Sequence, residues 1–282
     1  MGSQGSAMSL KRRIQRWYQR HRREWLRRHA DVHIISFPKC GRTWLVLMIA
    51  RVIERHYGIT VSDPLKLRLF RKKLRSLPLI LQHHDGGPEF LRVDELEQDK
   101  SRYSGAKVIF LVRDPRDVTI SAYFQKTRRN NDFSGTINEY LHQPVGSIDT
   151  NVEFYNIWAR NRSVPRDFLL LAYEDMHEDV VRELRRVVEF LGVSGVPDTV
   201  LREAADSCSF ENMRRMEADN ALGSKRLAPR DAADETTYKT REGRVGGYVR
   251  HLHPAQITYM DDLIAERLDP LYARYWPGRY PG

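Results

Sequence analysis

Residues 32–57 read VHIISFPKCGRTWLVLMIARVIERHY, a stretch that contains two contrasting patterns joined by a short polar segment. Its first part, VHIISF, is an apolar run rich in Val and Ile, which is typical of a strand buried on both faces of a parallel sheet. Its last part, TWLVLMIARVIERHY, has the length of a helix. Between them lies PKCGRT, a turn with one glycine, two basic side chains and a threonine. The stretch therefore predicts a strand, a tight turn and a helix, in that order.

Two more segments repeat this order. The apolar run AKVIFLV at 106–112 precedes RDPRD and then VTISAYFQK, and DFLLLAYEDM at 167–176 precedes VVRELRRVVEFLG. In the last helix, which should end at Gly192, the following apolar residues share one face: Val181, Leu184, Val187, Val188 and Leu191. Repeated strand and helix units predict an α/β fold with a P-loop-like central parallel sheet, flanked by helices on both faces.

The composition favours one domain. With 282 residues, 41% of them hydrophobic, the chain can bury a full core, and we expect a single domain over residues 31–282. There is no run of 18 apolar residues and no N-terminal apolar signal segment, so we expect a cytoplasmic protein. Cys40 and Cys208 lack metal-ligand spacing and should be free thiols. Residues 1–7, MGSQGSA, look like the remnant of an expression tag and are left out of the fold prediction.

The positive charge is concentrated near the N-terminus. Residues 8–30 hold nine Lys or Arg and one Glu, whereas the rest of the chain is nearly balanced. Apolar and aromatic residues recur there at helical spacing and predict a basic amphipathic segment: Leu10, Ile14, Trp17, His21 and Trp25. We favour packing of this stripe on the domain. The alternatives are contact with a membrane surface or an acidic partner, and, least favoured for lack of a recognised motif, nucleic acid.

The turn PKCGRT has the chemistry of an anion site. In open parallel sheets, ligands bind at the carboxyl ends of strands, where turns lead into helix N-termini. The first helix amides lack partners and carry the positive end of the dipole, so they attract phosphate or sulfate. Gly41 lets the backbone approach the ligand, Lys39 and Arg42 add positive charge, and Thr43 can donate a hydrogen bond. The lysine precedes the glycine, so the turn is not a Walker A loop.

A second turn, RDPRD, follows the strand at 106–112. Asp114 is the expected N-cap, with Pro115 at the first helical position and Asp117 in the capping-box position. Arg113 should then lie at the carboxyl end of its strand, at the same sheet edge as Lys39. An arginine at a strand end can also be a salt-bridged rim residue.

These features resemble the family of sulfotransferases that use 3′-phosphoadenosine 5′-phosphosulfate (PAPS). The resemblance spans most of residues 32–247. Residues 38–44 are similar to the family's PKSGTTW loop, which holds the 5′-phosphosulfate, and Arg113 with Ser121 is similar to the pair that binds the 3′-phosphate. Three more elements follow in the family's order: YEDM at 173–176, the Ser209 and Phe210 pair, and REGRVGGY at 241–248, which partly matches RKGxxGDW.

The resemblance implies PAPS as sulfuryl donor, adenosine 3′,5′-bisphosphate as product, and no requirement for a metal ion. It implies the following donor-binding residues: Lys39, Cys40, Gly41, Arg42, Thr43, Trp44, Arg113, Ser121, Tyr173, Ser209, Phe210, Arg241 and Gly243. Four positions depart from the family pattern: Cys40, Arg42, Glu242, and Tyr248, which stands where the family has a tryptophan. Cys40 replaces a serine and Arg42 a threonine, so a backbone amide or a guanidinium, which binds phosphate well, takes over a hydroxyl contact. Glu242 stands where the family often has a lysine, which weakens the expected 3′-phosphate site unless Arg244 substitutes.

Sulfuryl transfer requires an in-line nucleophile, stabilisation of the leaving phosphate and a base for the acceptor's proton. The family places its base in the region that corresponds to residues 77–87, LPLILQHHDGG. By resemblance, His84 rather than His83 is that base, and Lys39 stabilises the leaving phosphate. A histidine with a pKa near neutrality suits this role. Asp85 either orients the imidazole of His84 or only starts the turn.

The acceptor is left open as a sugar hydroxyl, a phenol, another alcohol or an amine on a carbohydrate or small metabolite. Residues 66–75 hold six basic side chains that either line an acceptor entry or form a solvated face, which we favour. The irregular stretch 218–247 is expected to be a lid over the nucleotide. Two other functions compete: a nucleotide phosphotransferase, which lacks its Walker A pattern here, and a non-catalytic binder of anionic polymers.

Overall fold

The computed structural model describes residues 17, 21–22, 24–223, 227–231, 233–234 and 237–279. The expected tag remnant and most of the basic N-terminal segment lie outside these residues. The described members of its apolar stripe, Trp17, His21 and Trp25, are exposed, so the expected packing of the stripe on the domain is wrong for them. Contact of this segment with a membrane surface stays a prediction. Among the described helices, none has both the length and the apolar character needed to cross a membrane.

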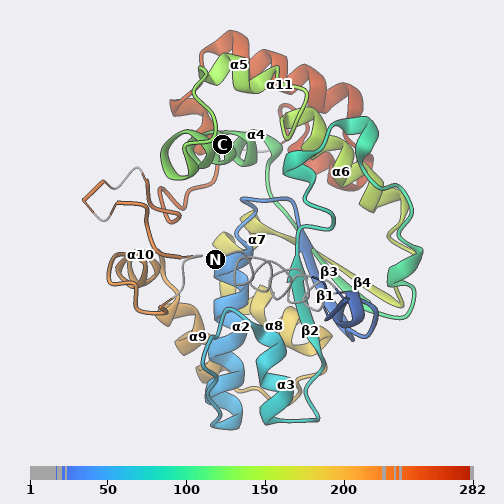
Figure 1. Cartoon of the computed structure of the whole chain (residues 1–282), viewed down its shortest axis with the longest axis vertical. Coiled ribbons are helices and arrows are strands. Elements are labelled where there is room, and N and C mark those ends of the chain that lie inside the picture. Colours follow the sequence, from blue (N-terminus) through green and yellow to red (C-terminus); the bar gives the residue numbers. More distant parts are fainter. Residues whose placement is uncertain are drawn as a thin grey trace, which may run out of the picture.

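Four parallel strands form the central sheet in the order β2, β1, β3, β4 (Figure 1). Their bounds are Val32–Ser36 for β1, Ile80–His83 for β2, Lys107–Val112 for β3 and Asp167–Ala172 for β4. All of β1 and all of β3 after Lys107 are buried, as their apolar sequences predict. Strand β2 is not among the sequence predictions, which identify residues 77–87 only as an apolar run that ends in two histidines.

The α-helices are α2 (Arg42–Tyr57), α3 (Phe70–Lys73), α4 (Pro115–Phe124), α5 (Ile137–Leu141), α6 (Ile148–Arg160), α7 (Tyr173–Glu178), α8 (Val180–Phe190), α9 (Asp198–Ser207), α10 (Phe210–Ala218) and α11 (Pro254–Arg267). A π-helical turn, Gln125–Asn130, continues α4, and a 3₁₀ turn, Pro270–Tyr275, follows α11. Short 3₁₀ turns occur at Leu67–Leu69, Pro88–Phe90, Val93–Glu95, Ser101–Tyr103 and Gly247–Arg250. The described residues between Ala218 and Gly247 form no α-helix or strand, in agreement with the irregular sequence there.

The connections of the sheet run in opposite directions from its centre. The chain leaves β1 through α2 and returns as β2 on one side, and it leaves β3 through α4 and α6 and returns as β4 on the other. Because such crossovers are right-handed, α2 and α4 must cover opposite faces of the sheet. Figure 1 shows α2, α8 and α9 together on one side and α4, α6 and α11 on the other, and each group packs together. The predicted α/β architecture is confirmed, and the gap between β1 and β3 is its topological switch point.

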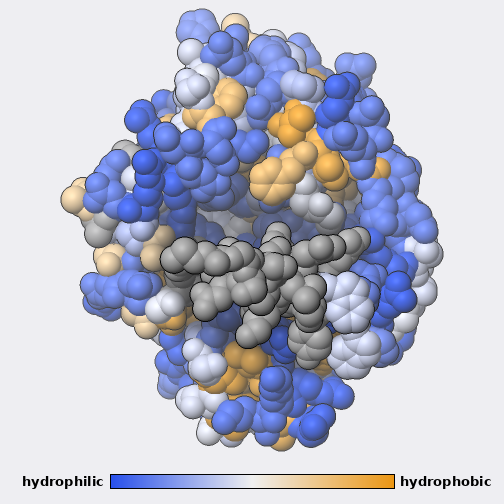
Figure 2. All heavy atoms as spheres, viewed as in Figure 1, coloured by the Kyte–Doolittle hydropathy of each residue, from blue (hydrophilic) through white to orange (hydrophobic). Residues whose placement is uncertain are grey.

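Aromatic side chains fill the core between β3 and α6. The ring of Phe110 stacks on Trp158 with 5.4 Å between the centroids, and Phe154 and Tyr155 contact Phe110 from the same helix. All four are at most 1% exposed. These aromatic residues of α6 are therefore core, whereas hydrophilic side chains predominate on the outer face shown in Figure 2.

Helix α2 begins and ends at glycines in the left-handed conformation, with φ 88° at Gly41 and φ 64° at Gly58. A Cβ atom added to Gly41 would lie 2.6 Å from the ring of Tyr173, whereas one added to Gly58 meets nothing within 4 Å. Only the first glycine therefore has both a conformational and a steric requirement.

Replacing each of these glycines by alanine separates the two requirements. Gly58→Ala should lower the free energy of unfolding by about 1–2 kcal/mol, the usual cost of the left-handed conformation. Gly41→Ala should lower it by about 2–5 kcal/mol, because displacement of the Tyr173 ring adds an overpacking cost of about 1–3 kcal/mol. Urea unfolding measures both. Equal losses in the two variants would contradict the close packing of Gly41 on Tyr173.

Candidate functional site

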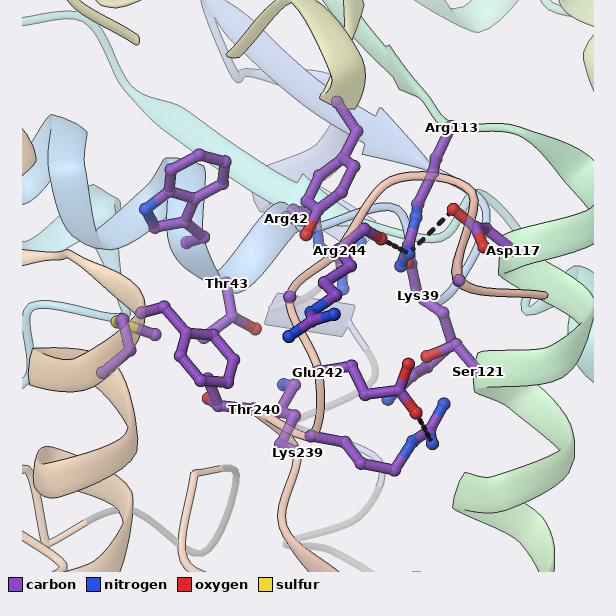
Figure 3. Close-up of a pocket in the computed structure, with 18 of the residues that line it drawn as sticks. Lys39, Arg42, Thr43, Arg113, Asp117, Ser121, Lys239, Thr240, Glu242 and Arg244 are labelled. Carbon is purple, nitrogen blue, oxygen red and sulfur yellow. Dashed lines mark hydrogen bonds and ion pairs between the residues drawn. The ribbon is translucent and has the colours of Figure 1, made fainter. Parts of the chain in front are cut away.

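The two predicted turns meet at the switch point. The turn after β1 and the turn after β3 lie at the same sheet edge and enclose a pocket of about 190 Å³ (Figure 3). Twelve of the fourteen residues predicted from the sequence line it, and the two others are Cys40 and Ser209. Six of the lining residues, predicted or not, have basic Lys or Arg side chains: Lys39, Arg42, Arg113, Lys239, Arg241 and Arg244. Against these six stand two carboxylates, Asp117 and Glu242, so the pocket favours anions.

The first turn presents the start of α2 to the pocket. Gly41 is the N-cap of α2 and supplies no side-chain cap, and no acidic residue lies in the first turn of the helix. The first amides of α2 therefore keep their capacity to bind an anion. Lys39 has φ 75°, and its Nζ donates to Gln125 Oε1 at 2.7 Å. Burial lowers the pKa of Lys39 well below its usual value, and the nearby Lys239 lowers it further.

Cys40 faces the core instead of the pocket. Its side chain is fully buried and its Sγ lies 3.3 Å from the hydroxyl of Tyr155. Burial raises the pKa of Cys40 to about 12, so the group is a thiol. Only the backbone of Cys40 is left to bind a donor. Both cysteines are free, as expected from their spacing.

Tyr155 joins the two turns, which the sequence does not predict. Its hydroxyl donates to the carbonyl of Arg113 at 2.9 Å and accepts from the amide of Arg113 at 3.0 Å. The same hydroxyl contacts Cys40 in the other turn. A buried tyrosine on α6 therefore fixes the distance between the turn after β1 and the turn after β3.

Arg113 lies across the pocket between these turns. Its Nη1 donates to the carbonyl of Lys39 at 3.3 Å, and its Nη2 donates to Asp117 at 3.2 Å and to the carbonyl of Arg244 at 2.8 Å. The guanidinium also stacks over Tyr173, 4.4 Å from the ring centroid. Its Nε is buried and has no hydrogen-bond partner among the described residues, so this donor can serve a ligand.

Asp117 does not form the capping box that its position predicts. Asp114 caps α4 by accepting from the amide of Arg116. The carboxylate of Asp117 instead accepts from the amides of Gly246 and Tyr248, at 2.9 and 3.0 Å. Helix α4 thereby holds the segment 239–248 over the pocket, which supports the expectation that part of residues 218–247 covers the ligand.

Segment 239–248 brings Arg241 and Glu242 together. Glu242 forms an ion pair with Arg241, and its carboxylate lies 2.9 Å from His251 Nε2. The guanidinium of Arg241 lies 4.0 Å from the ring centroid of Phe124. The carboxylate that departs from the family pattern is thus paired with the cation of Arg241. A Cβ atom on Gly243, which has φ 59°, would lie 2.4 Å from Phe210, so this position also requires glycine.

Aromatic residues close the other end of the pocket. Trp44 donates through Nε1 to the carbonyl of Cys208 at 2.9 Å and meets the Tyr173 ring edge-on at 5.8 Å between centroids. His177, which the sequence analysis does not identify, lies 5.0 Å from Trp44 and 4.6 Å from Tyr173, centroid to centroid. Ser209 caps α10 through a 3.3 Å bond from the amide of Asn212, so its side chain serves the helix.

His84 has a defined tautomer. Its Nδ1 lies 2.8 Å from the carbonyl of Ser36, which can only accept, so Nδ1 carries the proton. The other nitrogen, Nε2, therefore has the lone pair, and it accepts from Arg42 Nη2 at 2.7 Å. Burial and the positive charge of Arg42 lower the pKa of His84 well below its usual value. His84 is a neutral imidazole whose Nε2 points to the pocket side.

Asp85 does not orient His84. Its carboxylate is fully buried and binds Lys100 at 2.8 Å, together with Arg102 and Tyr103. Burial raises the pKa of Asp85, but Lys100 and Arg102 outweigh this and hold it at about 2. Of the two roles left open by the sequence, orientation of the imidazole is thus taken by the carbonyl of Ser36.

His83 points away from His84. Its Nδ1 accepts from the amide of Asp85 at 3.1 Å, so its Nε2 carries the proton and donates to His33 Nδ1 at 3.0 Å. Burial lowers the pKa of both rings, that of His33 to about 4. His83 and His33 form a buried neutral pair. Within the described residues, no group of three or more His, Cys, Asp or Glu has a metal-binding arrangement.

A second cavity, of about 620 Å³, adjoins the first. Arg42, Thr43 and His84 line both cavities and so form the wall between them. On the far side, Glu89 Oε2 is buried without a hydrogen-bond partner among the described residues, and burial raises the pKa of this carboxyl. The exposed ring of Phe90 lies at the same cavity.

Comparisons with known proteins agree with this architecture. Sulfotransferase 2A1 of Macaca fascicularis is 27% identical, and the match covers 91% of this chain and 90% of the relative. Cytosolic sulfotransferase 17 of Arabidopsis thaliana is 24% identical, with 84% and 74% covered. A mouse sulfotransferase crystallised with PAP superposes with a TM-score of 0.60 at 24% identity, covering 85% of this chain and 84% of that one. Retinol dehydratase with androsterone and PAP gives 0.62 at 16% identity, with 89% and 82% covered.

The two solved structures are similar to this chain in fold. A family model described as the sulfotransferase domain matches residues 29–271, which contain both turns, the whole sheet and all the residues that line the basic pocket. Its match extends over most of the chain, and on this ground the chain belongs to the sulfotransferase family.

Proposed function

We propose that this sulfotransferase uses PAPS as its donor and transfers the sulfuryl group to a hydroxyl or amine of a small acceptor. The convergence of the two turns on one basic pocket carries the proposal, together with Arg113 Nε, which has no hydrogen-bond partner within the described part of the chain. Structural neighbours were crystallised with PAP, which is adenosine 3′,5′-bisphosphate, and these complexes support this choice of nucleotide.

The pocket residues fit such a donor. The first amides of α2 and Lys39 suit the 5′-phosphosulfate. Arg113, through its buried Nε, and Ser121 on α4 suit the 3′-phosphate, and Arg241 lines the same pocket. Trp44 and Phe210 offer ring faces to the adenine. The close packing of Gly41 and Gly243 on aromatic rings keeps the backbone near the ligand.

The donor, when bound, supplies an activated sulfuryl group on a phosphate leaving group. His84 accepts the acceptor's proton at Nε2, the only ring nitrogen with a lone pair. The bond from its Nδ1 to Ser36 holds the ring in this tautomer. Lys39 stabilises the negative charge that develops on the leaving phosphate. An anion beside Lys39 offsets the effect of burial and favours its protonated form.

The second cavity is the proposed acceptor site. It shares Arg42, Thr43 and His84 with the basic pocket, so an acceptor bound there would lie beside the donor and the proposed base, as transfer between them requires. The printed names of relatives and neighbours include a flavonol 3-sulfotransferase and a retinol dehydratase, so small hydroxyl compounds are suitable acceptors for a screen. Glu89, with its unpartnered oxygen, favours an acceptor that carries an additional hydrogen-bond donor.

Nucleotide selectivity is the first test. A ligand at 100 times its dissociation constant adds about 2.7 kcal/mol to the stability of the folded protein. Adenosine 3′,5′-bisphosphate should therefore raise the melting temperature more than AMP at equal concentration, because only the bisphosphate reaches Arg113 and Ser121. In Arg113→Ala this advantage should vanish. Stronger stabilisation by ATP with Mg²⁺ than by the bisphosphate would overturn the assignment of the donor.

The base is tested by His84→Ala, assayed with any phenol or alcohol that the wild type sulfates. Turnover should fall by about 10²–10⁴-fold, the usual contribution of a general base, while affinity for the bisphosphate persists. His83→Gln is the control. It disturbs the pair with His33 and should lower stability, but the folded variant should keep its turnover. Normal turnover in His84→Ala refutes the assignment.

The role of Tyr155 is tested by Tyr155→Phe. The variant leaves both backbone groups of Arg113 without their partner, so the free energy of unfolding should fall by about 1–3 kcal/mol. Affinity for the bisphosphate, measured by calorimetry, should fall as well because the two turns lose their common contact. Tyr140→Phe removes a buried hydroxyl whose one hydrogen bond among the described residues goes to the carbonyl of Gly146, and Tyr140 does not line the pocket. It should lose stability without losing affinity.

A further inference from the structure

The hydrogen bond from Arg42 to His84 raises a question about the reaction. A base must have a free lone pair, yet the lone pair of His84 Nε2 is taken by a guanidinium nitrogen at 2.7 Å. The other nitrogen is committed to Ser36. In this arrangement an acceptor hydroxyl that approaches His84 has to compete with a permanent cation for the same atom.

Arg42 lies between His84 and the basic pocket, so its guanidinium can contact either His84 or an anion bound in the pocket. It is the first residue of α2, directly after Gly41, and lines both the basic pocket and the second cavity. Figure 3 shows Arg42 and Thr43 among the residues around the same pocket as Lys39 and Arg244. An anion bound at the start of α2 would therefore lie within the reach of the guanidinium.

The energetics favour the anion. A guanidinium hydrogen bond to a phosphate or sulfate oxygen joins two opposite charges and can be bidentate, whereas the bond to His84 joins a cation to a neutral ring. Burial strengthens this difference because the local dielectric constant is low. A bound phosphosulfate is thus the better partner for Arg42.

We propose that Arg42 is a positioning residue that occupies His84 Nε2 until the donor binds, and that donor binding draws it onto the phosphosulfate and frees the base. This rests on the proposed function. The acceptor's O–H proton then passes to Nε2, the acceptor oxygen bonds to sulfur, and the bond from sulfur to the phosphate oxygen breaks with its electron pair left on the phosphate. The base is therefore available only when a phosphate or phosphosulfate is bound at the start of α2.

Other charged groups also face His84 and must be considered. Lys239, from the segment over the pocket, lowers the pKa of His84, as does the neighbouring His83. Glu89 shares the second cavity, and Asp85 is held by Lys100 and Arg102. Of the groups that touch the imidazole, Arg42 is the one that the turn would also direct to an anion, so a change at Arg42 isolates the effect.

The protonation of His84 can be followed by NMR with ¹³Cε1-labelled histidine, its signal assigned by its loss in His84→Gln. In the wild type, saturating adenosine 3′,5′-bisphosphate should raise the pKa of His84 toward the ordinary value near 6.5. In Arg42→Thr, the residue that the family has at this position, the pKa should be raised already without ligand, and the bisphosphate should add less. Arg55→Thr, on the same helix but outside both cavities, should behave as wild type.

Calorimetry on the same samples distinguishes a wrong donor assignment from a wrong role for Arg42. If the bisphosphate does not bind the wild type, the proposed donor is wrong. If it binds but leaves the pKa of His84 unchanged, or if the free Arg42→Thr protein has the wild-type pKa, the role proposed for Arg42 is wrong. Should Arg42→Thr fail to fold, Arg42→Gln keeps the size of the side chain, removes the charge and decides the question by the same measurement.

Discussion

The register between β1 and β3 is the constraint on which the site depends. Ser36 pairs with Leu111, so the two central strands end side by side, and their chains then leave in opposite directions. This arrangement places two helix-forming turns next to each other at one sheet edge. The hydroxyl of Tyr155, bound to both turns, fixes their separation. Neither turn alone forms a pocket.

The sequence alone predicts those strands and helices whose residue pattern is local. Apolar runs predict β1, β3 and β4, and the periodicity of residues 180–192 predicts α8. Family resemblance adds the residues of the basic pocket, twelve of which lie together around it. Whether these residues bind PAPS, and whether His84 is the base, stay predictions.

The features that the sequence does not predict depend on contacts between residues that lie far apart in the chain. Strand β2 is short and ends in histidines, so its pattern alone does not identify a strand. Asp117 has the spacing of a capping box, but the amides of Gly246 and Tyr248, 129 and 131 residues away, compete for its carboxylate. Tyr155 has the pattern of a core aromatic residue, and only the fold shows that its hydroxyl serves the turns. The ion pairs of Asp85 are likewise not predictable from the sequence, because its partners Lys100 and Arg102 lie in a segment without a periodic pattern.

The buried ion cluster around Asp85 has a consequence for how the enzyme can diversify. Asp85 follows His84 directly and is anchored from the side by Lys100, Arg102 and Tyr103, while the imidazole itself is held by β1 through Ser36. Residues 86–90, which border the second cavity, lie beyond this anchor. The rim of the cavity can therefore be exchanged while Nε2 of His84, the proposed base, keeps its place. In the proposed mechanism, acceptor choice and chemistry are thus separable properties, for selection as for a protein engineer.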